Sequence, residues 1–73
     1  MADIKIKNEQ VLGEVEVNEN KKFVVSQVDS SIGEYINVQQ HYMKDDEWHK
    51  GKGQWLPLDR AEEIAQCILV AFE

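Results

Sequence analysis

The residues best suited to binding chemistry lie in the stretch HKGKGQW, residues 49–55. It holds two lysines, Lys50 and Lys52, each followed by a glycine, and it ends at Trp55. A nucleotide-binding P-loop needs a glycine, four residues and then Gly-Lys-Ser/Thr, between a strand and a helix. Here Gly-Lys-Gly is followed by Gln54 and Trp55, with no serine or threonine, and a strand rather than a helix is expected next. A P-loop is therefore excluded. Two alternatives remain: a hairpin whose glycines supply positive φ, or a contact with nucleic acid.

The other candidate ligands and nucleophiles form no catalytic or metal-binding motif. His41, His49 and Cys67 lack the short paired spacing of structural zinc ligands. The serines have no nucleophile motif around them. We therefore expect a protein that is not an enzyme, with no metal, no cofactor and no small-molecule substrate.

Size and composition predict one small intracellular domain over residues 1–73. The single cysteine, Cys67, fits a reducing cytoplasm. The first ten residues read as neither a secretion signal nor a membrane anchor. We expect a cytoplasmic location, nucleoid-associated in a bacterium, and no membrane contact. A chain this short buries little surface alone, which favours a second subunit.

The charge distribution bears on any nucleic-acid hypothesis. Eight lysines and arginines against fourteen acids give −6, and an acidic protein repels polyanions at long range. Residues 35–58, however, hold three acids and three lysines, together with both histidines. The acidity is therefore concentrated outside the central segment.

Hydrophobic periodicity predicts a sheet followed by a helix. Period-two alternation and turn residues indicate strands around 4–17, 21–28, 34–43 and 54–58. The first strand is expected to bend at Gly13. Residues 44–53 are expected to form a long loop or a hairpin tip. Because Pro57 cannot donate to a ladder, the last strand is expected to be an edge or to end there. Asp59 as N-cap and Glu62 as its capping-box partner begin an amphipathic helix that runs to the C-terminus. The predicted fold class is α+β, β-β-β-β-α, an antiparallel sheet with its apolar face covered by the helix.

The third predicted strand has an unusual uncharged polar face. Tyr35, Asn37, Gln39 and His41 share it, whereas Tyr42 belongs to the opposite, more apolar face. Lysines and further aromatic residues lie close by in the sequence. Single-strand binders use lysines to contact phosphates and aromatic rings to stack on bases. Taken singly, Trp55 and Tyr42 are also compatible with a place in the core, and Trp48 with covering an edge of the sheet.

At these residues the chain resembles the transcriptional coactivator family called positive cofactor four, including its small bacterial and phage relatives. The resemblance runs from about Lys22 to Leu69. YINVQQHYM is similar to the family's characteristic strand, HKGKGQWLPL to its Gly-Lys-Gly segment and short aliphatic strand, and LPLDRAEEIAQCI to the acidic helix of bacterial members.

The resemblance implies a curved four-stranded sheet, one helix and a homodimer that binds single-stranded DNA with little sequence preference. Gln39 stands where the family usually has a DNA-contacting arginine, and His41 replaces a tyrosine. Tyr42 occupies the family's aromatic position, and Lys50 and Lys52 match its basic loop. The lost arginine removes a fixed charge and a stacking plane.

The sequence thus predicts a single-strand-binding homodimer, acting on DNA or RNA, with a coactivator-like role in transcription or a role in replication or repair. The predicted contact residues are Gln39, His41, Tyr42, Lys44, Trp48, Lys50, Lys52 and Trp55. The alternative is a protein-interaction dimer that has kept the fold and lost nucleic-acid affinity, which the −6 charge and the missing arginine favour.

Overall fold

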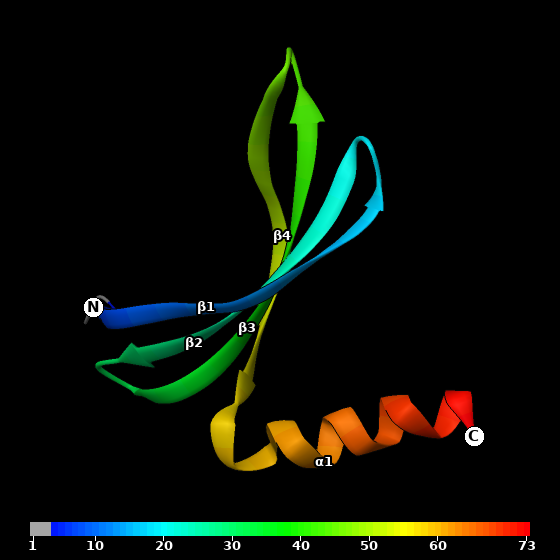
Figure 1. Ribbon diagram of the computed structural model, residues 1–73. Coiled ribbons are helices and arrows are strands. Elements are labelled where there is room, and N and C mark those ends of the chain that lie inside the picture. The colour runs from blue at the N-terminus through cyan, green and yellow to red at the C-terminus, as the bar shows by residue number, and fades with distance from the viewer. Residues whose placement is uncertain (1–3) are drawn as a thin grey trace.

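A computed structural model describes residues 4–73, and the first three residues of the predicted domain lie outside it. Within this range the chain forms four strands, one α-helix and a final 3₁₀ turn (Figure 1). The elements are β1 (Ile6–Asn18), β2 (Lys21–Ser30), β3 (Gly33–Lys44), β4 (Glu47–Pro57), α1 (Leu58–Leu69) and η1 (Val70–Phe72). The predicted order β-β-β-β-α and the α+β class are confirmed.

The strands form one antiparallel sheet in sequence order, β1-β2-β3-β4, joined by tight hairpins. Both predicted turns are present. At the first, the Asn20 backbone N–H donates to the Asn18 side-chain oxygen at 2.8 Å, the local bond that makes asparagine a turn residue. At the second, Gly33 has φ 132°, which a residue with a Cβ rarely adopts.

The segment 44–53 contains the predicted hairpin tip, but the alternative of a long loop is wrong, because β4 runs through most of it. Asp45 and Asp46 alone form the turn, with φ of 55° and 61°. Positive φ at both central residues is what a type I′ hairpin requires, and aspartate tolerates it. The glycines of HKGKGQW therefore supply no positive φ: among the described glycines only Gly33 has one. HKGKGQW is a strand.

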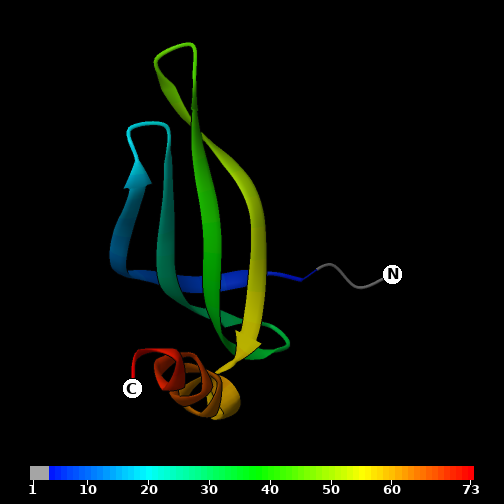
Figure 2. The same ribbon diagram turned by 90° about the vertical axis from the view of Figure 1, so that its right-hand side faces the viewer.

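The sheet is strongly curved (Figure 2). The register of β1 shifts between Val11 and Gly13, next to the predicted bend, and β1 changes direction sharply there. Ile4 and Ile6 line one pocket with Trp55, although β1 and β4 are opposite edges of the sheet. The two edges therefore approach each other over one face, which we call the concave face.

The two faces of the sheet differ in burial and in chemistry. Directly paired residues of antiparallel strands point to the same side, so the pairing assigns each side chain to a face. Among residues 4–73 the buried ones all lie on the concave face: Val24, Val28, Ser26, Ser30 and Asn37. The opposite, convex face carries Phe23, Val25, Ile36, Val38 and Leu56 and is only half-buried.

Helix α1 differs from its prediction at both its start and its packing. It begins at Leu58 with Pro57 as N-cap, and within the described chain no side chain caps it. Asp59 lies in the first turn, where its charge favours the positive end of the helix dipole. The predicted capping box is therefore wrong, because the helix follows β4 with no linker in which a cap could form.

The helix does not cover the sheet. It contacts β3 and β4 only near its start and extends away from them (Figure 1). No residue of α1, which lies wholly within the described chain, is buried. The expectation that the helix covers the apolar face is thus wrong for the single chain. Within residues 4–73 no helix has the length and apolar character that crossing a membrane requires.

Candidate nucleic-acid interface

The pairing of β3 with β4 separates the eight predicted contact residues. Five lie on the concave face: Gln39, His41, Trp48, Lys50 and Trp55. Tyr42 lies on the convex face, where its ring stacks on His49 with centroids 5.6 Å apart and planes at 25°. Lys44, two residues further along β3, points to the same side as Tyr42. Lys52 is exposed at a register shift in β4.

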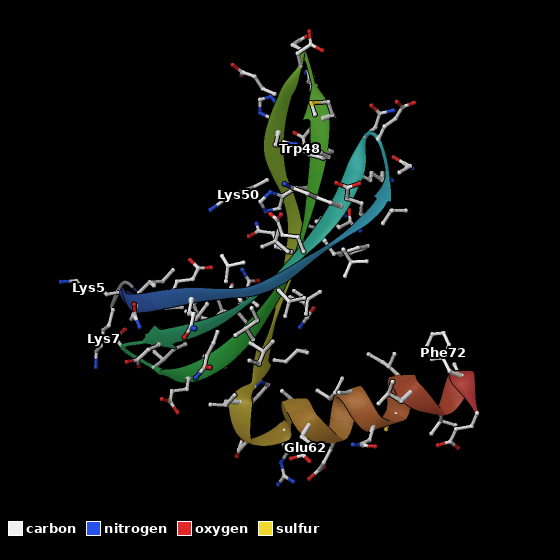
Figure 3. All side chains as sticks on the ribbon, in the orientation of Figure 1. Lys5, Lys7, Trp48, Lys50, Glu62 and Phe72 are labelled. Carbon is white, nitrogen blue, oxygen red and sulfur yellow. The ribbon has the colours of Figure 1, made fainter. Side chains whose placement is uncertain are left out.

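The five concave residues form a row along β3 and β4. Trp48 lies toward the tip of the hairpin (Figure 3), Lys50 pairs with His41 further down, and Trp55 lies at the end nearest the helix. The two tryptophans are seven positions apart along an extended strand, which is a span of about 20 Å. A row of this length can meet several consecutive groups of an extended polymer.

Trp48 is the exposed aromatic group of this row, at 38% exposure. The Lys22 ammonium lies 4.5 Å from the centroid of its ring, a cation–π contact. The same ammonium is 3.2 Å from the Glu14 carboxylate. Lys22 thus shares its charge between an acid and an indole, and a base stacking on this face of the ring would displace it.

At the other end of the row two rings pack together. Tyr35 and Trp55 have centroids 5.2 Å apart with planes at 36°, a tilted contact within the usual range for aromatic pairs. Both side chains are half-buried. The pair gives this end of the concave face a fixed aromatic platform.

Between the rings, side-chain amides form a short hydrogen-bonded chain. The Asn37 amide donates to the Gln39 oxygen at 3.3 Å, and the Gln39 amide donates to the Gly51 carbonyl at 3.3 Å. Gly53 lies close by, since a Cβ there would be 3.2 Å from the Asn37 oxygen. These contacts hold Gln39 in place across the face. The close approach to Asn37 gives a physical reason for glycine at position 53 that does not involve phosphate.

Carboxylates of β1 line the same face. The pairing of β1 with β2 places Glu9, Glu14 and Glu16 there. Glu9 accepts a hydrogen bond of 2.7 Å from the buried Ser26 hydroxyl. These acids oppose the lysines of β2 and β4, so the concave face carries both signs of charge.

Sequence reasoning missed Lys22 and the β1 glutamates as parts of this face, and it placed Tyr35 and Asn37 on the polar face of the third strand without counting them as contact residues. The pairing register of β2 with β3 could have placed Lys22 on this face. A two-residue turn at Ser31 and Ile32 pairs Ser30 with Gly33, and counting back places Lys22 opposite His41. The β1 glutamates could not be placed this way, because the register shifts of β1 change which face each residue occupies.

Comparison of the chain with protein-family models, with curated proteins and with solved structures gives no match. Within residues 4–73 no three metal-ligating side chains lie close enough together to hold an ion. The resemblance to the positive cofactor four family, and the contact residues inferred from it, remain predictions that the geometry of the concave face refines.

Proposed function

We propose that the chain binds single-stranded DNA, or RNA, on its concave face, with little sequence preference and as a homodimer. The observation that carries the proposal is the row of Trp48, Lys50 and Trp55 on one curved surface with uncharged amides between the rings. Rings that stack on bases and cations that meet phosphates are the two parts that sequence-independent single-strand binding needs. Its role would lie in transcription, replication or repair.

Surface area supports the homodimer. A compact monomer of 8.5 kDa exposes about 4,700 Å², whereas this chain exposes 6045 Å². The difference of about 1,300 Å² exceeds the roughly 800 Å² that each partner of a standard interface buries. The uncovered surface is apolar: Ile68, Leu69, Val70 and Phe72 of the helix end and Val15 and Val17 of β1 are more than half exposed. A second copy of the chain would cover it.

The proposal predicts a change in salt dependence when the hairpin lysines are removed. Each phosphate neutralised on a single strand contributes about −0.7 to the slope of log K against log salt. Lys50→Ala combined with Lys52→Ala should therefore weaken binding to an oligo-dT and make the slope shallower by up to about 1.4 per protomer. Fluorescence anisotropy at four or five salt concentrations measures both quantities.

A matched control removes the same charge elsewhere. Lys5, just before β1, and Lys7, near the start of β1, lie away from Trp48 and Lys50 (Figure 3). Lys5→Ala combined with Lys7→Ala should leave the slope nearly unchanged. If the Lys50 and Lys52 variant matched the parent in affinity and slope, these lysines would not contact phosphate.

A second candidate function is a protein-interaction dimer without nucleic-acid affinity. The observation in its favour is the line of three β1 glutamates on the concave face, one of which is paired with Lys22. Such a surface suits a partner with basic and apolar side chains better than a polyanion. Oligonucleotide titration separates the two candidates, because an adaptor of this kind would not respond.

A further inference from the structure

A cavity of about 240 Å³ opens on the concave face between β1 and β4. Val11 and Val24 form apolar walls, and the polar groups come from Glu9, Ser26, Asn37, Gln39, His41 and Lys50. It is smaller than the cavities of about 300–1,000 Å³ that hold drug-sized ligands. Its size and mixed lining suit one flat, polar ring system, such as a single unpaired base.

The hydrogen bonds around the cavity leave acceptors on its β1 side. The Ser26 hydroxyl donates to Glu9 Oε2, so its proton is already committed. The Asn37 and Gln39 amides each donate one hydrogen bond to an oxygen of the protein, and each keeps its second N–H. Within residues 4–73 the other oxygen of Glu9, Oε1, accepts no hydrogen bond and forms no ion pair. The cavity thus presents a carboxylate acceptor on one side and, from β4, the Lys50 ammonium donor.

Among the four bases, guanine fits this polarity best. Its N1–H and N2–H₂ groups form an edge of adjacent donors that a carboxylate accepts in two parallel bonds. Its O6 and N7 acceptors are the atoms that lysine contacts in specific recognition. Thymine offers a single ring donor, and adenine and cytosine each offer one amino group. A carboxylate and an ammonium that line the same cavity therefore favour guanine over the other three bases.

We propose that this cavity is a base-binding subsite that takes guanine, with the Glu9 carboxylate accepting from N1–H and N2–H and Lys50 donating to O6 or N7. The inference rests on the proposed function and deepens it: an interface that otherwise binds any single strand gains a preference for a guanine at one position. The Ser26 hydroxyl acts as a positioning group, because its hydrogen bond fixes the carboxylate.

The test compares a dT₁₅ oligonucleotide with one whose central residue is dG, by fluorescence anisotropy. A carboxylate–guanine pair of this kind discriminates by about fivefold or more, so the dG oligonucleotide should bind at least about fivefold more tightly. Glu9→Gln should abolish the difference and retain an oxygen for the Ser26 hydroxyl. Glu16→Gln, which removes the same charge from the same face of β1 outside the cavity, should keep it.

A second measurement tests whether a free guanine nucleotide binds in the cavity. It distinguishes a failure of the guanine subsite from a failure of single-strand binding. The side-chain amide signals of Asn37 and Gln39 are followed by NMR on addition of guanosine or thymidine monophosphate. Shifts with the guanine nucleotide alone support the subsite even if no oligonucleotide binds, which would overturn only the single-strand function. Equal binding of both oligonucleotides, with no guanine-specific shift, overturns the subsite and leaves that function standing. No response to either oligonucleotide or nucleotide overturns both.

Discussion

Replacing Ile68 with lysine is expected to raise the dissociation constant of the homodimer by about 10²- to 10⁴-fold. Ile68 is 60% exposed in the single chain, on the apolar side of α1. Burying an isoleucine side chain contributes about 1.5–3 kcal/mol, and a two-fold interface contains the residue twice. The sum of about 3–6 kcal/mol corresponds to that change in affinity. Sedimentation velocity over a range of protein concentrations measures it.

The control places the same lysine on the other side of the helix. Gln66 lies among the acidic and polar residues of α1, so Gln66→Lys should leave the dimer intact. A parent protein that stays monomeric at every concentration would contradict the homodimer. An Ile68→Lys variant that dimerises as tightly as the parent would show that the contact between copies lies elsewhere.

Replacing Trp48 with alanine is expected to weaken binding to an oligo-dT by about 5- to 150-fold. Stacking one base on an aromatic side chain contributes about 1–3 kcal/mol, and Trp48 is the exposed ring of the concave row. Loss of the ring also removes the cation–π contact that positions Lys22. Trp48→Phe should recover much of the affinity, because a smaller ring still stacks.

Tyr42 offers a matched control for this substitution. It lies in the same hairpin as Trp48, with a similar exposure of 40%, but it points to the convex face. Tyr42→Ala should therefore leave oligo-dT affinity within about twofold of the parent, as expected for a ring that no base reaches. If Tyr42→Ala weakened binding as much as Trp48→Ala, the assignment of binding to the concave face would be wrong.

The strands and their order could be predicted because local signals were strong. Alternation and asparagine or glycine turns marked the hairpins at 18–20 and 31–33, and apolar spacing marked the helix. The length of β4 was missed because its turn is Asp45-Asp46, a charged pair in place of Asn-Gly. The segment from Glu47 to Gly53, rich in charge and glycine, resembled a loop, yet it pairs with β3 on both sides of a register shift.

The candidate site was only partly predictable, because closeness in sequence is not closeness on a sheet. Tyr42 follows His41 directly, yet the two side chains point to opposite faces. Lys22 was not singled out, although pairing places it opposite His41 and beside Trp48. The pairing of hairpins decides such neighbours, and a one-residue shift moves each side chain to the other face.

The amphipathic helix posed a different problem. Its apolar spacing correctly indicates a side that avoids water, but spacing does not say which surface covers that side. The sequence suggested the chain's own sheet. In the structure the helix contacts β3 and β4 only near its start, and Phe72 at its far end is 81% exposed. The direction in which α1 leaves Pro57 decides this outcome, and no pattern in the helix itself records that direction.

The most direct test of single-strand binding on the concave face follows the emission of Trp48 itself. In a Trp55→Phe variant, whose remaining tryptophan is Trp48, addition of oligo-dT at low salt should quench the fluorescence to saturation. Added salt should reverse the quenching, because binding releases counterions. Emission that stays constant as oligo-dT is added would contradict the account.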